Sequence, residues 1–122
     1  MNIILSNSSQ IPIYQQIVEQ VREAVIKGDV LQGEAMPSIR TLAKDLKISV
    51  ITTKRAYEEL EREGLLTSIT GKGTFVSPTN LELMKEARLK EIEQHLETAC
   101  ILAKSVGIEE ANLHEMLKLL YD

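Results

Sequence analysis

The sequence predicts a mainly helical chain that carries one small β-hairpin and divides into two parts. Between Met36 and Ser77, two stretches with apolar residues at helical spacing are joined by a short turn, and a hairpin with a Gly-Lys-Gly tip follows them. That order of elements is the order of a winged helix-turn-helix. We therefore expect a winged helix-turn-helix domain in residues 1–78 and a helical hairpin in residues 79–122.

An opening helix is expected over residues 11–27, as a scaffold for the two helices that follow. Proline at position 12 is tolerated near the first turn of a helix, and Gly28 ends the pattern. The apolar residues at helical spacing are Ile13, Ile17, Val21, Ala24 and Val25. Residues 1–10 form a polar arm with a short apolar piece, and either a strand or a loose extension fits them.

The first helix of the central pair is expected to begin after Ser38. Pro37 cannot continue a preceding helix, and serine is a favourable N-cap. The apolar face of this helix is Ile39, Leu42, Ala43 and Leu46. In the turn, residues 47–49, Ile48 is the apolar residue that would hold the two helices together and Ser49 can cap the second helix.

The second helix is predicted from a regular inner face, and Gly64 ends it. That face is Thr53, Ala56, Tyr57 and Leu60, and we expect Tyr57 in the core. Two short strands are then expected at Leu65–Ile69 and Thr74–Val76. The glycines of the connection between them supply the positive backbone angles that a tight hairpin needs.

Positive charge is concentrated on the two paired helices. Residues 38–55 contain five basic side chains and one acidic side chain, a local charge of +4, whereas the whole chain carries −4 at pH 7. Residues 79–122 contain five basic and nine acidic side chains, a net −4, so residues 1–78 sum to zero. A basic helix face is often merely solvated, but on a helix-turn-helix it predicts contact with DNA phosphates.

Residues 11–77 resemble the DNA-binding domain of the GntR family of bacterial transcription regulators. The matching segments are IPIYQQIVEQVREAVIKGDVLQGEAMPSIRTLAKDL, TTKRAYEELEREGLL and TGKGTFV. The short C-terminal part is similar to that of the YtrA-type subfamily, which implies a pair of helices used for dimerisation. The resemblance implies a sequence-specific regulator, in most cases a repressor, that binds a pseudo-palindromic operator in double-stranded DNA as a homodimer.

The resemblance also implies which residues touch DNA. They are Ser38 and Arg40 in the first helix, Ser49, Thr52 and Lys54 at the head of the second helix, and Thr70, Gly71 and Lys72 in the wing. The chain departs from the family pattern at the turn, where Ser49-Val50-Ile51 replaces a polar Asn-Pro-Asn run. Val50 and Ile51 could each touch a thymine methyl group or serve as packing residues.

Two helices are expected in the C-terminal part, over residues 81–106 and 109–121, with Gly107 between them. The first has heptad spacing, typical of a seam between helices. Because two helices cannot bury both apolar faces alone, we expect a second copy to cover them in a two-fold dimer. The expected dimer residues are Leu89, Ile92, Leu96, Ala99 and Ala103 on the first helix and Leu113, Leu117 and Leu120 on the second.

Several other classes are disfavoured by the sequence. The chain has no run of about 20 apolar residues that would span a membrane, no signal-peptide pattern, and one cysteine, Cys100, which fits a reducing cytoplasm. No catalytic motif is present, so we expect neither an enzyme nor a cofactor. His95 and His114 each follow a glutamate by four residues, and we expect surface ion pairs there and no metal site.

Two alternatives remain open from the sequence. The chain could be a regulator gated by a small-molecule effector at the dimer interface, or a winged-helix module that binds a protein and not DNA. The operator and any effector are not encoded in a recognisable motif.

Overall fold

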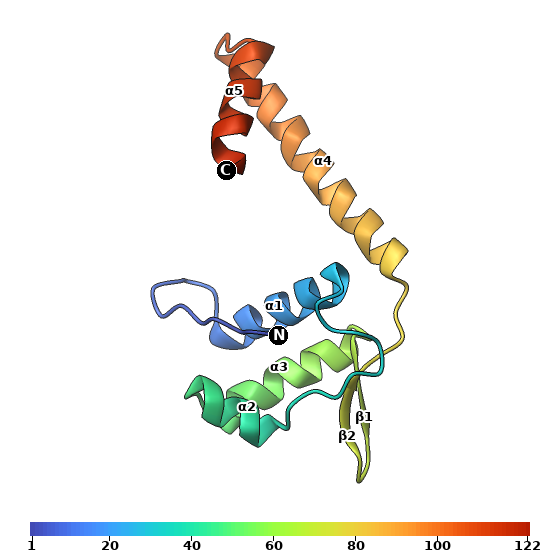
Figure 1. Cartoon of the computed structure of the whole chain (residues 1–122). Coiled ribbons are helices and arrows are strands. Elements are labelled where there is room, and N and C mark those ends of the chain that lie inside the picture. The colour runs from blue at the N-terminus through green and yellow to red at the C-terminus, as the bar shows by residue number, and fades with distance from the viewer. The chain divides into compact units, whose positions relative to one another are not determined.

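The computed structural model describes residues 1–122 and contains five helices and one two-stranded sheet (Figure 1). The helices are α1 (Ile13–Lys27), α2 (Ile39–Leu46), α3 (Val50–Arg62), α4 (Leu81–Ser105) and α5 (Glu110–Tyr121). The strands are β1 (Leu66–Ile69) and β2 (Gly73–Val76). The chain divides into two compact units, Met1–Leu81 and Glu82–Asp122. The predicted fold class, mainly helical with one hairpin, is confirmed.

Helix α3 is the centre of the first unit. It packs against α1, α2 and β1, and Figure 1 shows it between α1 and α2. Its predicted inner face is fully buried, with Thr53, Ala56, Tyr57 and Leu60 each at most 1% exposed. Other buried apolar side chains of the first unit are Ile17, Val21, Val25, Leu42, Ala43, Leu65, Leu66 and Val76. Burial of these residues from four elements fixes the position of α3.

The two paired helices begin in the same way, at a serine that caps the backbone. The Oγ atoms of Ser38 and Ser49 each accept a hydrogen bond, 3.1 Å long, from the backbone N–H three residues later. Both predicted caps are therefore confirmed. Between the helices Lys47 adopts a left-handed conformation with φ of 58°, and it is the only residue other than glycine with positive φ. This reversal lets the chain turn sharply from α2 into α3.

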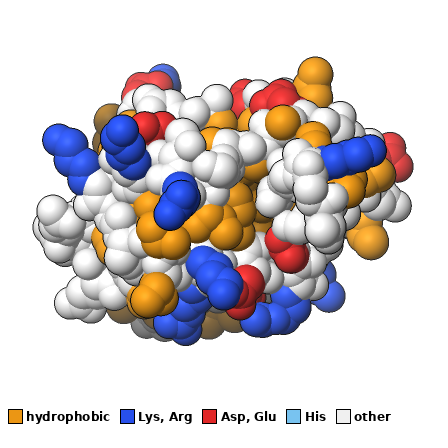
Figure 2. Space-filling view, turned by 90° about the horizontal axis from the view of Figure 1, so that it is seen from below, with side chains coloured by type: hydrophobic (Ala, Val, Ile, Leu, Met, Phe, Trp, Pro, Cys, Tyr) orange, Lys and Arg blue, Asp and Glu red, His pale blue; other side chains and the backbone are white.

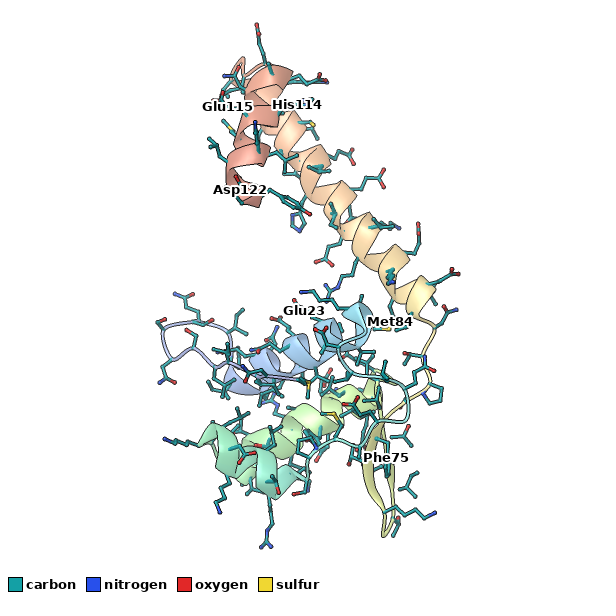
Figure 3. All side chains as sticks on the ribbon, in the orientation of Figure 1. Glu23, Phe75, Met84, His114, Glu115 and Asp122 are labelled. Carbon is teal, nitrogen blue, oxygen red and sulfur yellow. The ribbon has the colours of Figure 1, made fainter.

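The wing has one more pairing than the sequence predicted. Strands β1 and β2 are antiparallel, with Leu66 opposite Val76 and Ile69 opposite Gly73. The segment before α2 forms an isolated bridge to this hairpin, between Ala35 and Phe75 of β2. Figure 3 labels Phe75 on the hairpin. Three backbone hydrogen bonds of 2.8–2.9 Å fix this segment: Gly33 N–H to Val76 O, Val76 N–H to Glu34 O, and Met36 N–H to Thr74 O. The hairpin is thereby anchored to the chain that enters α2.

The N-terminal arm is neither a strand nor loose. Two glutamines one turn apart on α1 hold it in place through their side-chain amides. Gln20 accepts from the Ile4 N–H at 2.9 Å and donates to the Ile4 carbonyl at 2.7 Å. Gln16 accepts from the Ser6 N–H at 2.9 Å and donates to the Ser6 carbonyl at 3.1 Å. The side chains thus supply the hydrogen bonds that a neighbouring strand would otherwise give.

The second unit is a pair of helices with little internal core. Gly107, with φ of 72°, ends α4, and α5 turns back and diverges from it (Figure 1). Only Ala103 is buried in α4, and no residue is buried in α5. The exposed large apolar side chains are Leu83, Leu89, Ile92, Leu96, Ile101, Leu102, Val106, Met116, Leu117, Leu119, Leu120 and Tyr121. None of the helices is both long and apolar enough to cross a membrane.

Candidate nucleic-acid interface

The head of α3 is ordered by a pair of hydroxyl groups. The Ser49 Oγ accepts from the Thr52 N–H and donates to the Thr52 Oγ1 at 2.8 Å. In this arrangement the Thr52 hydroxyl accepts, so its own proton remains available to donate to an external acceptor. Ser49 is exposed and Thr52 is half-buried. The first turn of α3 therefore presents a fixed hydroxyl donor.

The head of α2 repeats this arrangement. The Ser38 Oγ accepts from the Thr41 N–H and donates to the Thr41 Oγ1, again at 2.8 Å. Arg40 lies in the same turn and is exposed. A guanidinium beside the uncapped N–H groups of a helix start suits a phosphate oxygen, because the start of a helix carries partial positive charge.

Two apolar side chains stand exposed at the start of α3. Ile51 is 79% exposed and Val50 is 49% exposed. The sequence allowed these residues either to pack internally or to face outwards. Their exposure excludes internal packing for Ile51, which lies on the side of α3 opposite the buried Thr53 and Tyr57.

The two basic residues that follow on α3 differ in their surroundings. Lys54 is 64% exposed and its Nζ lies 3.8 Å from the Glu58 Oε1. An exposed pair of this kind contributes little stability, so Lys54 can exchange Glu58 for a phosphate or a base edge. The Arg55 guanidinium instead stacks on Tyr14 of α1, 3.8 Å from the ring centroid. This contact joins Arg55 of α3 to the scaffold helix α1.

Two polar groups on the buried face of α3 hold the first part of this helix in position. The Thr53 Oγ1 donates to the Ser49 carbonyl at 3.0 Å, which explains a threonine on an otherwise apolar face. The Tyr57 hydroxyl donates to the Pro37 carbonyl at 2.6 Å, and so links α3 to the chain that enters α2. Burial raises the pKa of Tyr57 to about 12. The tyrosine therefore remains a neutral donor across the physiological range.

The wing ends in an exposed turn that contains the predicted residues Thr70, Gly71 and Lys72. The Lys72 N–H donates to the Ile69 carbonyl at 2.9 Å and closes the turn. Gly71 has φ of 78°, a conformation that a residue with a Cβ adopts only under strain. Figure 1 shows the tip directed away from α1, on the side of α3 where α2 lies.

Figure 2 shows the molecule from below, which is the side of the first unit where α2 and the hairpin tip lie in Figure 1. Lys and Arg side chains stand around hydrophobic side chains on this face, with a smaller number of acidic ones between them. Such a surface combines charges for phosphates with apolar groups for base edges. All eight sequence-predicted residues belong to the two helix heads and the wing of the first unit, and none is fully buried: Ser38, Arg40, Ser49, Thr52, Lys54, Thr70, Gly71 and Lys72.

No group of three or more His, Cys, Asp or Glu side chains could hold a metal ion. The His114 Nε2 lies 3.9 Å from the Glu110 Oε2, as an exposed pair one turn apart on α5. Cys100 is a free, exposed thiol on α4.

Comparison with known proteins agrees with this geometry. Residues 13–76, which are 64 of the 122 residues, match the model of the family described as bacterial regulatory proteins, gntR family. The HTH-type transcriptional repressor YtrA of Bacillus subtilis is 36% identical over 110 residues, which cover 90% of this chain and 85% of YtrA.

Solved structures extend the likeness. A transcriptional regulator from Oenococcus oeni superposes with a TM-score of 0.74 over 97% of this chain and 98% of its own, at 23% identity. The DNA-binding domain of AraR, solved in complex with operator ORX1, has a TM-score of 0.56 at 26% identity, over 63% of this chain and 96% of its own. The predicted resemblance is confirmed: the chain belongs to the GntR family of bacterial regulatory proteins.

Proposed function

We propose that this protein is a sequence-specific DNA-binding regulator that represses transcription by occupying an operator. The observation that carries the proposal is the head of α3, where an ordered hydroxyl donor, Thr52, an exposed cation, Lys54, and exposed apolar groups stand together. In a helix-turn-helix, the first residues of the second helix contact base edges in the major groove. The resemblance to the repressor YtrA and to an operator-bound AraR domain supports this reading.

The roles of the contact residues follow from their positions. We assign Thr52 and Lys54 to base edges, and Ser38, Arg40 and Ser49 to the phosphate backbone beside the two helix starts. In the wing, we assign Thr70, Gly71 and Lys72 to the phosphates or the minor groove beside α3, the proposed recognition helix. Phosphate contacts give affinity that falls with salt, whereas contacts to base edges give sequence choice. Since the proposed ligand is chromosomal DNA, the protein would act in the cytoplasm.

We also propose that residues 79–122 form the dimerisation region. The supporting observation is that α4 and α5 leave their apolar residues largely exposed, with Leu89, Ile92 and Leu96 each more than half exposed. Heptad spacing of these residues suits a helix of a second copy. A two-fold dimer would present two recognition helices to half-sites about 10 bp apart or a multiple of it, which is the geometry of a pseudo-palindromic operator.

The test is a binding titration with the full chain. Duplexes are first enriched from a random library, and one enriched duplex is compared with its scrambled sequence by fluorescence anisotropy at two salt concentrations. We expect the enriched duplex to bind about 1000-fold or more tightly than the scrambled one, with both affinities falling as salt rises. Equal, weak binding to both duplexes would reject the DNA-reading function and favour a protein partner for the winged helix.

A further inference from the structure

Binding to phosphates does not explain Ile51 at the start of α3. Its side chain is 79% exposed in a well-formed helix, although its neighbours Thr53, Ala56 and Tyr57 are buried. Ile51 therefore adds almost nothing to the core of the folded chain. An exposed isoleucine gains nothing from a charged, hydrated phosphate, whereas contact with an apolar group of a base would remove part of its surface from water.

The position of Ile51 restricts what that surface can be. It is the second residue of α3, directly before the hydroxyl donor Thr52 and three residues before Lys54. In a helix-turn-helix this turn lies deepest in the major groove. The only apolar group that an unmodified base pair displays there is the 5-methyl group of thymine.

The rest of the outer face of α3 confines the contact to this first turn. One turn after Ile51, Arg55 is held on the Tyr14 ring. The next residues on the same face include Glu58, which is exposed and acidic and would be repelled by phosphates. The helix can therefore enter the groove only by its N-terminal end, where Ile51 and the half-exposed Val50 form the apolar tip.

We propose that Ile51, flanked by Val50, reads the 5-methyl group of a thymine in each half-site of the operator. This inference rests on the proposed DNA-reading function and names the base that the apolar tip selects. Burying one methyl group contributes about 0.8 kcal/mol, which corresponds to about a fourfold change in affinity for each half-site. The effect is therefore large enough to measure by titration and small enough to leave specific binding intact.

The experiment replaces thymine by deoxyuridine, which lacks only the 5-methyl group and keeps the same pairing. Each thymine of an enriched duplex is replaced in turn, and binding of the full chain is measured by anisotropy. We expect one position in each half-site where the replacement weakens binding of the wild-type protein about fourfold. The Ile51→Ala variant should bind the thymine duplex more weakly and should no longer distinguish thymine from deoxyuridine at that position.

Ile4→Ala is the matched control, because Ile4 is also an isoleucine of the first unit and is 72% exposed. This variant should keep the full preference for thymine. Thermal unfolding of both variants should match the wild type, since neither side chain is buried.

The outcomes separate the inference from the function on which it rests. If wild type and Ile51→Ala give the same profile across all deoxyuridine positions of a specific operator, Ile51 does not read a methyl group, although the regulator function stands. If no duplex is enriched from the library, the DNA-reading function and this inference are both wrong.

Discussion

At the scale of one residue, Tyr57 shows how a buried polar group links α3 to the chain that enters α2. Its ring is 1% exposed and its hydroxyl donates to the Pro37 carbonyl at 2.6 Å. Removal of the hydroxyl would leave that carbonyl without its partner. We expect Tyr57→Phe to lower the free energy of unfolding by about 1 to 2 kcal/mol at pH 7, measured by urea denaturation. An unchanged stability would mean that water replaces the hydroxyl at Pro37.

Burial of Tyr57 also makes the free energy of unfolding depend on pH in the alkaline range. The ordinary pKa of tyrosine is 10.0, and burial raises that of Tyr57 to about 12. A raised pKa contributes stability that is fully present below pH 10 and is lost as the pH rises towards 12. We expect the wild type to lose about 2 to 3 kcal/mol more than Tyr57→Phe over this interval. Parallel loss in both proteins would show that other groups cause the alkaline transition.

Lys47 is a second residue whose effect is local. It holds φ of 58° in the turn between α2 and α3, where glycine would be free of strain. We expect Lys47→Gly to raise the free energy of unfolding by about 0.5 to 1 kcal/mol, because the relief of strain exceeds the added entropy of the unfolded chain. The control is Lys44→Gly within α2, which should lower it by about 1 kcal/mol. Destabilisation by both changes would contradict the strain at Lys47.

At the scale of the element, substitutions in the wing and in α3, the proposed recognition helix, should affect DNA binding in different ways. Lys72 lies in an exposed turn whose backbone is fixed by its own hydrogen bond. We expect Lys72→Ala to weaken binding to every duplex alike and to reduce the salt slope by about one unit for each protomer. Changes of Thr52 or Lys54 should instead alter which base pairs are preferred. Lys118→Ala in α5 is the control and should leave both quantities unchanged.

At the scale of the whole molecule, the proposed dimer through the apolar faces of α4 and α5 can be tested by a single substitution. Leu96 stands in the middle of the heptad series and is 51% exposed in the single chain. We expect Leu96→Glu to convert a dimer into a monomer in sedimentation equilibrium, because a carboxylate would be buried without a partner. Operator affinity should fall at least 100-fold with the loss of the second reading head.

The control for this change is Leu31→Glu in the first unit, where Leu31 is also exposed. That variant should remain a dimer with unchanged operator affinity. A dimer that persists in Leu96→Glu would place the dimer interface outside the predicted seam.

The sequence by itself determined the elements and their order. Pro37, the serine caps at Ser38 and Ser49, and the glycines after α1, α3 and α4 act within a few residues of their own positions, so local chemistry sufficed to predict them. The buried face of α3 was equally readable, because helical spacing converts directly into one side of a helix. The sequence also placed an excess of basic residues on the paired helices, and these residues are exposed in the structure: Arg40, Lys44, Lys47, Lys54 and Arg55.

The tertiary structure decided what depends on residues far apart in the chain. Three contacts join segments that lie 10 to 41 residues apart. They are the bridge from Ala35 to Phe75, the hydrogen bonds of Gln16 and Gln20 to the N-terminal arm, and the stacking of Arg55 on Tyr14. No local pattern marks such pairs, because their partners become neighbours only after the core around α3 has formed. Helical spacing places Ile51 off the buried face of α3, but only the folded chain shows that no other element covers it, so that its side chain is 79% exposed.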